Sequence, residues 1–129
     1  METAFRSALV AWLRADTLLA DLVNGIEEET PVAASPPHIA IAASASTDWS
    51  SKTTSGREIR LALELVGRGD DPAACAEIAA RVEQRIATLP PQQAGYRVVV
   101  TQFLRSHAER RRKGLRAVLL EYRFKLLAT

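Results

Sequence analysis

Residues 43–66 read ASASTDWSSKTTSGREIRLALELV, and this stretch changes character halfway along. The first half, up to Gly56, consists almost entirely of Ser, Thr and other small residues, with Trp49 as its one large side chain. From Ile59 to Val66, apolar and polar residues alternate, which is typical of a half-buried strand with one apolar face. The stretch therefore predicts a polar connection that leads directly into a regular strand, and it leaves the purpose of Trp49 open.

Three further segments have the character of strands. They are HIAIA at 38–42, YRVVVTQFL at 96–104 and VLLEYRFKL at 118–126, the last with a clear alternation of apolar and polar residues. The basic segment RSHAERRRKG at 105–114 lies between the last two strands. We expect it to join them as a long hairpin.

Two segments have helical periodicity. In TAFRSALVAWLRADTLLADLV, residues 3–23, most apolar side chains fall on one face, but Asp16 would lie in the middle of that face. Since Asp is a good N-cap, we predict a long helix to about Ala15 and a short one that starts after Asp16. The second helical segment begins at Asp71-Pro72 and ends before the two prolines at 90 and 91.

The predicted order of elements is α-β-β-α-β-β, with no internal repeat. The economical arrangement is an α+β fold in which two main helices pack on one face of a four-stranded, mainly antiparallel sheet. A chain of 129 residues is of the right length for one domain, so we expect residues 1–129 to form a single domain.

The net charge of +2 conceals an asymmetry along the chain. Residues 1–37 carry two basic against six acidic side chains, whereas residues 97–129 carry nine basic against two acidic ones. Such ends can pair within one fold or between copies, and a basic end can also meet nucleic acid. No apolar run reaches the roughly 20 residues of a membrane span, and no signal peptide is recognisable, so we expect synthesis in the cytoplasm and no membrane partner.

The sequence offers no catalytic constellation. It has no glycine-rich phosphate loop, no Ser in a nucleophile elbow, and no His or Cys pair at metal-ligand spacing. The single Cys75 lies in an Ala-rich apolar run and is interpreted as a buried structural thiol. We therefore predict no enzyme activity, no catalytic residues, no cofactor and no metal.

Two polar segments are candidates for interaction. Arg110, Arg111, Arg112 and Lys113 could form a solvated hairpin tip, a protein interface, or a phosphate-binding patch. Aromatic residues, which nucleic-acid platforms usually provide, do not interleave with this run. Trp49 could either fill the end of the sheet beneath its loop or anchor in a neighbouring subunit.

Taken together, the segments resemble the tail-completion or tail-terminator family of long-tailed phages, prophages and gene transfer agents. The resemblance covers nearly the whole chain, from LRADTLLADLV through LEYRFKLLA, and its most specific part runs from WSSKT at 49–53 to GRE at 56–58. The chain departs from the family at His38-Ile39, where an aromatic residue is more usual. That departure concerns packing more than function.

The resemblance implies an α+β subunit that forms a ring, commonly a hexamer, which caps the tail tube and joins it to the head connector. The expected partners are further copies of the chain, the tail-tube protein and the head-connector protein. The expected location is the head-proximal end of the virion tail, after synthesis in the bacterial host. Nucleic acid is not expected as a partner, and whether the free subunit is a monomer stays open.

Seven residues are predicted to mediate these contacts. Arg110, Arg111, Arg112 and Lys113 would make electrostatic contacts, and Trp49, Lys52 and Arg57 would belong to a loop that orders on assembly. The alternative is a small nucleic-acid-binding module that uses the basic hairpin 105–116.

Overall fold

The computed structural model describes all residues, 1–129. The helices are α1 (Glu2–Arg14), α2 (Thr17–Leu22) and α3 (Pro72–Ala87), and a short 3-10 turn, η1, spans Arg112–Gly114. The strands are β1 (Gly25–Glu27), β2 (His38–Asp48), β3 (Gly56–Arg68), β4 (Gln92–Gln93), β5 (Tyr96–Arg111) and β6 (Leu115–Ala128).

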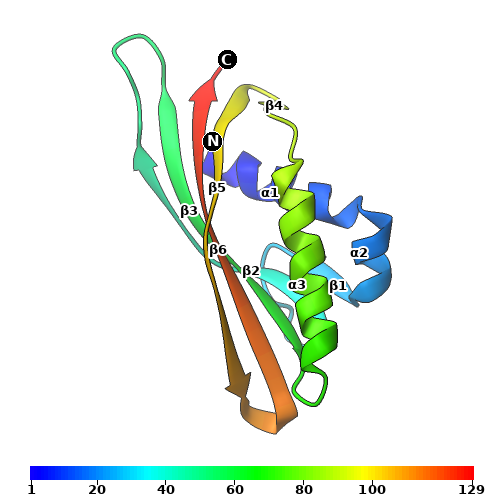
Figure 1. Cartoon of the computed structure of the whole chain (residues 1–129). Helices are drawn as coiled ribbons and strands as arrows, with labels where there is room; N and C mark the ends of the chain where they lie inside the picture. Colours follow the sequence, from blue (N-terminus) through cyan, green and yellow to red (C-terminus); the bar gives the residue numbers. More distant parts are fainter.

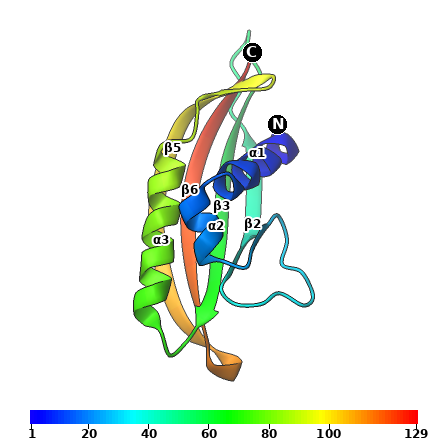
Figure 2. The same cartoon turned by 90° about the vertical axis from the view of Figure 1, so that its right-hand side faces the viewer.

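One six-stranded sheet with the order β1-β2-β3-β6-β5-β4 forms the body of the molecule (Figure 1). The β1 and β2 strands run parallel, and every other neighbouring pair is antiparallel. The sheet curls into a half-barrel, and the helices lie on one side of it (Figure 2).

The predicted fold class is therefore wrong. The sheet has six strands instead of four, it includes one parallel pair and curls into a half-barrel, and it carries three short helices of 13, 6 and 16 residues instead of two main ones. The two additional strands, β1 and β4, have three and two residues. Segments this short carry no periodicity that sequence analysis can detect.

The strands also extend further than the apolar pattern predicts. The β2 strand continues through the polar residues 43–48, and β5 continues through the basic segment 105–111. Ion pairs support the extension of β5, because Arg105 pairs with Glu121 on the neighbouring β6 and Arg111 pairs with Glu64 on β3. The expected hairpin between the last two strands is confirmed by their continuous pairing, which ends at Arg111 and Leu115.

The core lies between the sheet and the helices. Alternate side chains of β3 and β6 are buried, including Leu63, Leu120 and Phe124. The ring of Phe5 on α1 contacts that of Phe124, with centroids 4.6 Å apart. Cys75 on α3 is buried, as predicted. Gly67 on β3 allows β3 and α3 to lie close together here, because a Cβ at Gly67 would lie 2.5 Å from the Cys75 sulfur.

Asp16 marks the predicted break between α1 and α2. Its carboxylate accepts a hydrogen bond from the backbone N–H of Leu19 at 3.2 Å and so caps α2. The same carboxylate accepts two bonds from Arg81 of α3, at 2.7 Å from Nε and 2.5 Å from Nη2. Asp16 is only 7% exposed, so this bidentate pair satisfies an otherwise unfavourable buried charge and joins the two helices.

Replacement of Asp16 by Asn should lower the free energy of unfolding at pH 7 by about 2 kcal/mol, because it leaves Arg81 without its partner. The hydrogen bond from Arg81 lowers the pKa of Asp16 below its ordinary value of 3.8. The stabilisation is therefore complete above pH 3.8 and is lost as the pH falls through the lower, folded-state pKa. Denaturant titrations at pH 7 and in steps below pH 4 measure both effects.

The matched control is Asp21→Asn, which alters an exposed carboxylate of the same helix that makes no ion pair. We expect no change of stability for this variant at either pH. Equal stability of Asp16→Asn and the original protein at pH 7 would contradict the assignment.

Candidate assembly surfaces

The seven predicted contact residues fall into two groups at opposite ends of the sheet (Figure 1). Trp49, Lys52 and Arg57 belong to the β2–β3 hairpin, whose connection, residues 49–55, we call the β2–β3 tip. The four basic residues 110–113 lie at the end of the β5–β6 hairpin, where residues 110–114 form the β5–β6 tip. The structure therefore does not bring the two groups together.

The β2–β3 tip is closed by its own hydrogen bonds. The Ser50 hydroxyl donates to Asp48 at 2.6 Å and accepts from the backbone N–H of Gly56 at 2.9 Å. The hydrogen bonds from Ser50 hold the pKa of Asp48 below its usual range, and the nearby guanidinium of Arg57 acts in the same direction. The tip therefore has a defined turn within a single subunit, and its further ordering on assembly stays a prediction.

Gly56 allows the two strands of this hairpin to meet closely at the tip. A Cβ at this position would lie 2.4 Å from the backbone oxygen of Trp49, a distance that only a shift of the backbone could relieve. The N–H of Trp49 donates to the oxygen of Gly56 at 2.9 Å. The β2–β3 hairpin therefore requires glycine at position 56.

Trp49 is half-buried, and it lies neither wholly beneath the tip nor free in solvent. The ammonium of Lys125 on β6 sits 4.9 Å from the centre of its ring, within the range of a cation–π contact. Lys125 alternates with the buried Phe124 and Leu126, so this contact lies on the sheet face opposite the helices. Trp49 therefore fixes the tip to the outer face and leaves part of its ring available.

The β5–β6 tip is a tight turn. Lys113 and Gly114 both have positive φ, at 61° and 68°, which allows the chain to reverse within three residues. The Gly114 oxygen accepts a hydrogen bond from the N–H of Gly69 at 2.7 Å. This bond attaches the tip to the segment that leads into α3.

Arg111 differs from its three basic neighbours. Its guanidinium pairs with Glu109 at 2.9 Å and with Glu64 at 3.0 Å, and these two carboxylates raise the pKa of Arg111. Arg111 and His107 in turn lower the pKa of Glu109. Arg110, Arg112 and Lys113 are exposed and make no ion pair. Three free cations, and not four, are therefore available for a partner at this tip.

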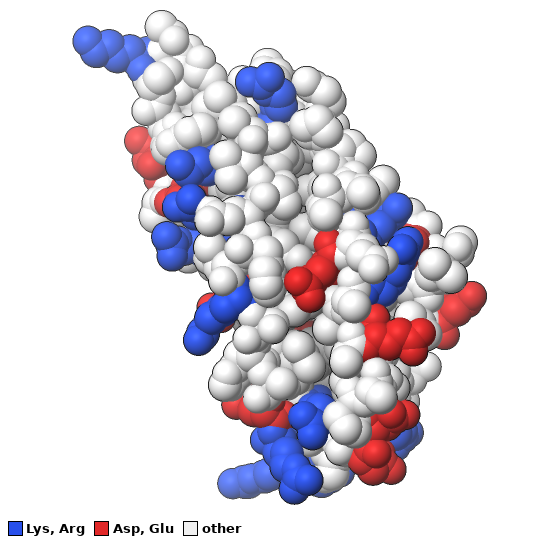
Figure 3. All heavy atoms as spheres, viewed as in Figure 1, with Lys and Arg blue, Asp and Glu red and all other residues white.

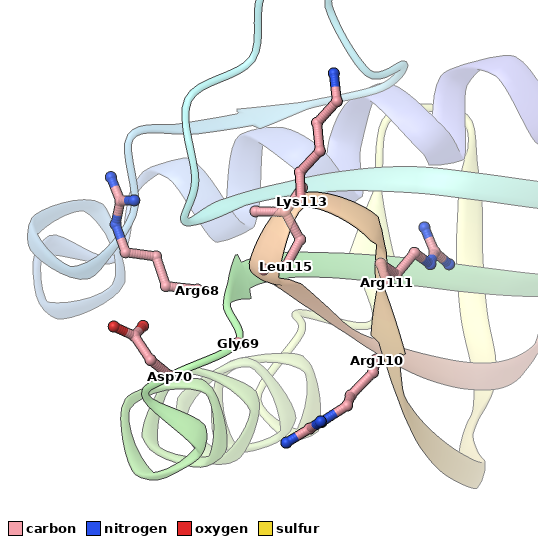
Figure 4. Close-up of a pocket in the computed structure, with 8 residues that line it drawn as sticks. Arg68, Gly69, Asp70, Arg110, Arg111, Lys113 and Leu115 are labelled. Carbon is pink, nitrogen blue, oxygen red and sulfur yellow. The ribbon is translucent and has the colours of Figure 1, made fainter.

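Next to the β5–β6 tip lies an open hollow of about 620 Å³, lined by Arg68, Asp70 and residues of the tip. Figure 4 shows that the side chains of Arg68, Arg110 and Lys113 point in different directions and do not converge on one point. Basic side chains gather at this end of the molecule, with acidic side chains close beside them (Figure 3). This arrangement is typical of a charged surface for a broad partner and not of a pocket for a small anion.

Sequence analysis missed an exposed apolar surface on β5. Val99, Phe103 and Leu104 are 42%, 41% and 40% exposed, although the apolar pattern of this strand suggested burial. The helices cover only the first part of β5, and all residues from Thr101 to Arg111 are exposed. The sequence pattern provides no signal for this, because an apolar pattern does not show whether another element covers the strand.

No group of three or more His, Cys, Asp or Glu side chains is placed to hold a metal ion. None of the helices combines the length and the apolar character needed to cross a membrane.

The comparisons with known proteins bear directly on the identity of the chain. The family described as Tail completion protein gp17 matches residues 7–126, which is nearly the whole chain. The chain belongs to the tail completion protein gp17 family. It is therefore a structural protein of phage-type tails that acts in virion assembly, and the resemblance drawn from its sequence is confirmed.

The fold has a counterpart among solved structures. A chain in the structure titled "Virion of native gene transfer agent (GTA) particle" superposes with a TM-score of 0.83 at 24% identity. The match covers 98% of this tail completion protein and 97% of the other chain. No match was found among curated proteins.

The distinct environments of Arg111 and Arg112 predict distinct effects of charge reversal. Arg111→Glu should lower the free energy of unfolding by about 1 kcal/mol, because it places a third carboxylate beside Glu64 and Glu109 in a partly exposed site. Arg112→Glu should leave the stability unchanged, since Arg112 has no partner within the subunit. Thermal unfolding of both variants measures the difference, and equal losses would contradict the pairing.

Proposed function

We propose that this tail completion protein closes the tail: copies of the chain form a ring, a hexamer in the assembled particle, that caps the tail tube and joins it to the head connector. Residues 1–129 would act as one tail-terminator-like domain in this ring. The observation that carries the proposal is the family match over residues 7–126, combined with two hairpin tips at opposite ends of one rigid sheet. A ring built from such subunits has a different hairpin tip on each rim.

The charges of the tips support two separate joints. At the β5–β6 tip, Arg110, Arg112 and Lys113 are free to contact carboxylates, for which Arg is well suited because it can bind them with two parallel hydrogen bonds. In the β2–β3 tip, Lys52 is exposed and part of the Trp49 ring is accessible, and Arg57 is exposed next to the tip on β3. One tip would meet the tail-tube protein and the other the head-connector protein, at the head-proximal end of the tail.

The proposed role is non-enzymatic. It requires only complementary surfaces. The basic side chains around the hollow beside the β5–β6 tip point in different directions, which does not suit a pocket for a small anion. The alternative, a nucleic-acid-binding module that uses hairpin 105–116, is less well supported by the geometry. Arg105 and Arg111 of that hairpin already pair with carboxylates of the same chain, which leaves fewer charges to neutralise phosphates.

Reversal of the three free charges tests the role of the β5–β6 tip. The variant Arg110→Glu/Arg112→Glu/Lys113→Glu keeps Arg111 and should therefore remain folded. In a strain that lacks the native gene, it should lower the yield of complete particles by at least about 100-fold, since reversed interface charges cost several kcal/mol. The measurements are particle titre, electron microscopy of separate heads and tails, and circular dichroism of the purified variant.

The matched control exchanges the same residues without loss of charge, as Arg110→Lys/Arg112→Lys/Lys113→Arg. It should complete tails at close to the normal yield. Normal yield from the charge-reversed variant would show that the β5–β6 tip is not a contact surface.

A further inference from the structure

The sheet has two long edges that no strand of the subunit covers. The β1 strand pairs with β2 only at residues 38–40, and β4 pairs with β5 only at Tyr96 and Arg97. On the outer side of residues 41–48 of β2 and residues 99–111 of β5, the backbone N–H and C=O groups therefore have no partner strand. Free backbone N–H and C=O groups in an extended strand are a ready template for another strand.

The β2 edge lacks part of the usual protection against such pairing, whereas the β5 edge carries charged side chains from Arg105 onward. Residues 41–47 of β2 contain no charged side chain and no proline, which are common means of blocking an edge. The β5 edge carries Val99, Phe103 and Leu104, which are three of the six exposed large hydrophobic side chains of the protein. Their clustering on one edge indicates a protein contact, because apolar side chains scattered over a surface would not group in this way.

The two free edges lie at the same level across the sheet. Followed through β3 and β6, the register places Ser46 in the same row as Thr101 and Ala45 in the same row as Gln102. A neighbouring subunit can therefore be added at one edge without a shift along the strands. This matters because a head-to-tail contact closes into a ring only when rotation is not accompanied by translation.

The strand directions are compatible as well. Three successive antiparallel pairings separate β2 from β5, so the two edge strands run in opposite directions. Rotation about a ring axis parallel to the strands leaves the direction of every strand the same in each copy. The β2 edge of one copy would thus run antiparallel to the β5 edge of its neighbour, which is the stronger of the two ways in which strands pair.

We propose that the β5 edge of each subunit pairs antiparallel with the β2 edge of the next copy, so that the sheets of a ring become continuous. This inference rests on the proposed ring and specifies its subunit contact. Bulges at Val99 and Leu104 limit regular pairing to residues 100–103 and 105–111 of β5. Phe103, whose ring centroid lies 5.5 Å from that of Tyr122 in its own subunit, would meet the row of the neighbour's Ser44, whose hydroxyl is hydrogen-bonded to Glu2 and Arg6 of α1.

Disulfide trapping tests this contact. In a Cys75→Ala background, the double variants Ala45→Cys/Gln102→Cys and Ser46→Cys/Thr101→Cys place one cysteine on each edge. Adjacent rows of an antiparallel pair alternate between hydrogen-bonded and non-hydrogen-bonded geometry, so the two variants sample both. Within one subunit the paired positions are three strand spacings apart, about 14 Å, and a disulfide cannot span that distance.

Mild oxidation, of the concentrated protein and of assembled particles, should convert the monomer band on a non-reducing gel into a ladder of covalent oligomers. The matched control is Ala45→Cys/Ala108→Cys, because Ala108 lies on the same edge of β5 but in the row of Ile39. This control should remain monomeric.

Three outcomes would overturn the edge pairing: no ladder from either variant in particles that contain the protein, an equal ladder from the control, or cross-links to a different tail protein alone. The proposed function is tested separately by tail completion. A ladder from a protein that fails to complete tails would contradict only the proposed function, whereas completed tails without a ladder would contradict only the edge pairing.

Discussion

The fold depends on the burial of the apolar side of β6. This strand is hydrogen-bonded on both edges, to β3 over residues 115–127 and to β5 over residues 115–128. Its alternate side chains Leu120, Tyr122, Phe124 and Leu126 lie at the centre of the core. The two strands that flank β6, β3 and β5, each adjoin one of the hairpin tips.

The covered and uncovered parts of the sheet divide the molecule by role. The helices cover the part of one face that lies between the two hairpin tips (Figure 1). There Phe5 contacts Phe124, and the Asp16–Arg81 pair joins α2 to α3. Beyond this cover, the sheet continues as exposed hairpin arms, and Arg111 at the end of one arm pairs with Glu64 of β3. Ion pairs of this kind keep an arm extended in water without a core beneath it. Such arms can present charges at some distance from the body of a small protein.

The sequence predicted those features that depend on local interactions of single side chains. The caps at Asp16 and Asp71 and the alternation that begins at Ile59 were all recognisable, since each follows from local hydrogen bonding or from burial of one face. The strand count was not predictable, because β1 and β4 are defined by pairing with distant residues and not by their own composition. The same holds for residues 105–111, whose strand conformation depends on β6 and whose sequence is typical of a loop.

The seven contact residues stay predictions, and only part of their surroundings could be inferred from the sequence. The basic run was found from its composition, but the internal role of Arg111 depends on Glu64, a residue 47 positions away, and could not be read from the run itself. Trp49 stands out in the sequence as a large side chain in a polar connection, but its contact with Lys125 depends on the register of β3 and β6 and is not visible in the sequence. The exposed edge of β5 escaped notice because an apolar pattern reports the tendency to be buried and does not reveal whether a cover exists.

The central claim is that this tail completion protein acts as a ring at the end of the tail. Electron cryomicroscopy of isolated tail tubes mixed with the purified protein tests it most directly. We expect additional ring-shaped density at one end of each tube and none at the other end or along its length. Tubes whose two ends stay free of added density, at protein concentrations that saturate any binding, would contradict the account.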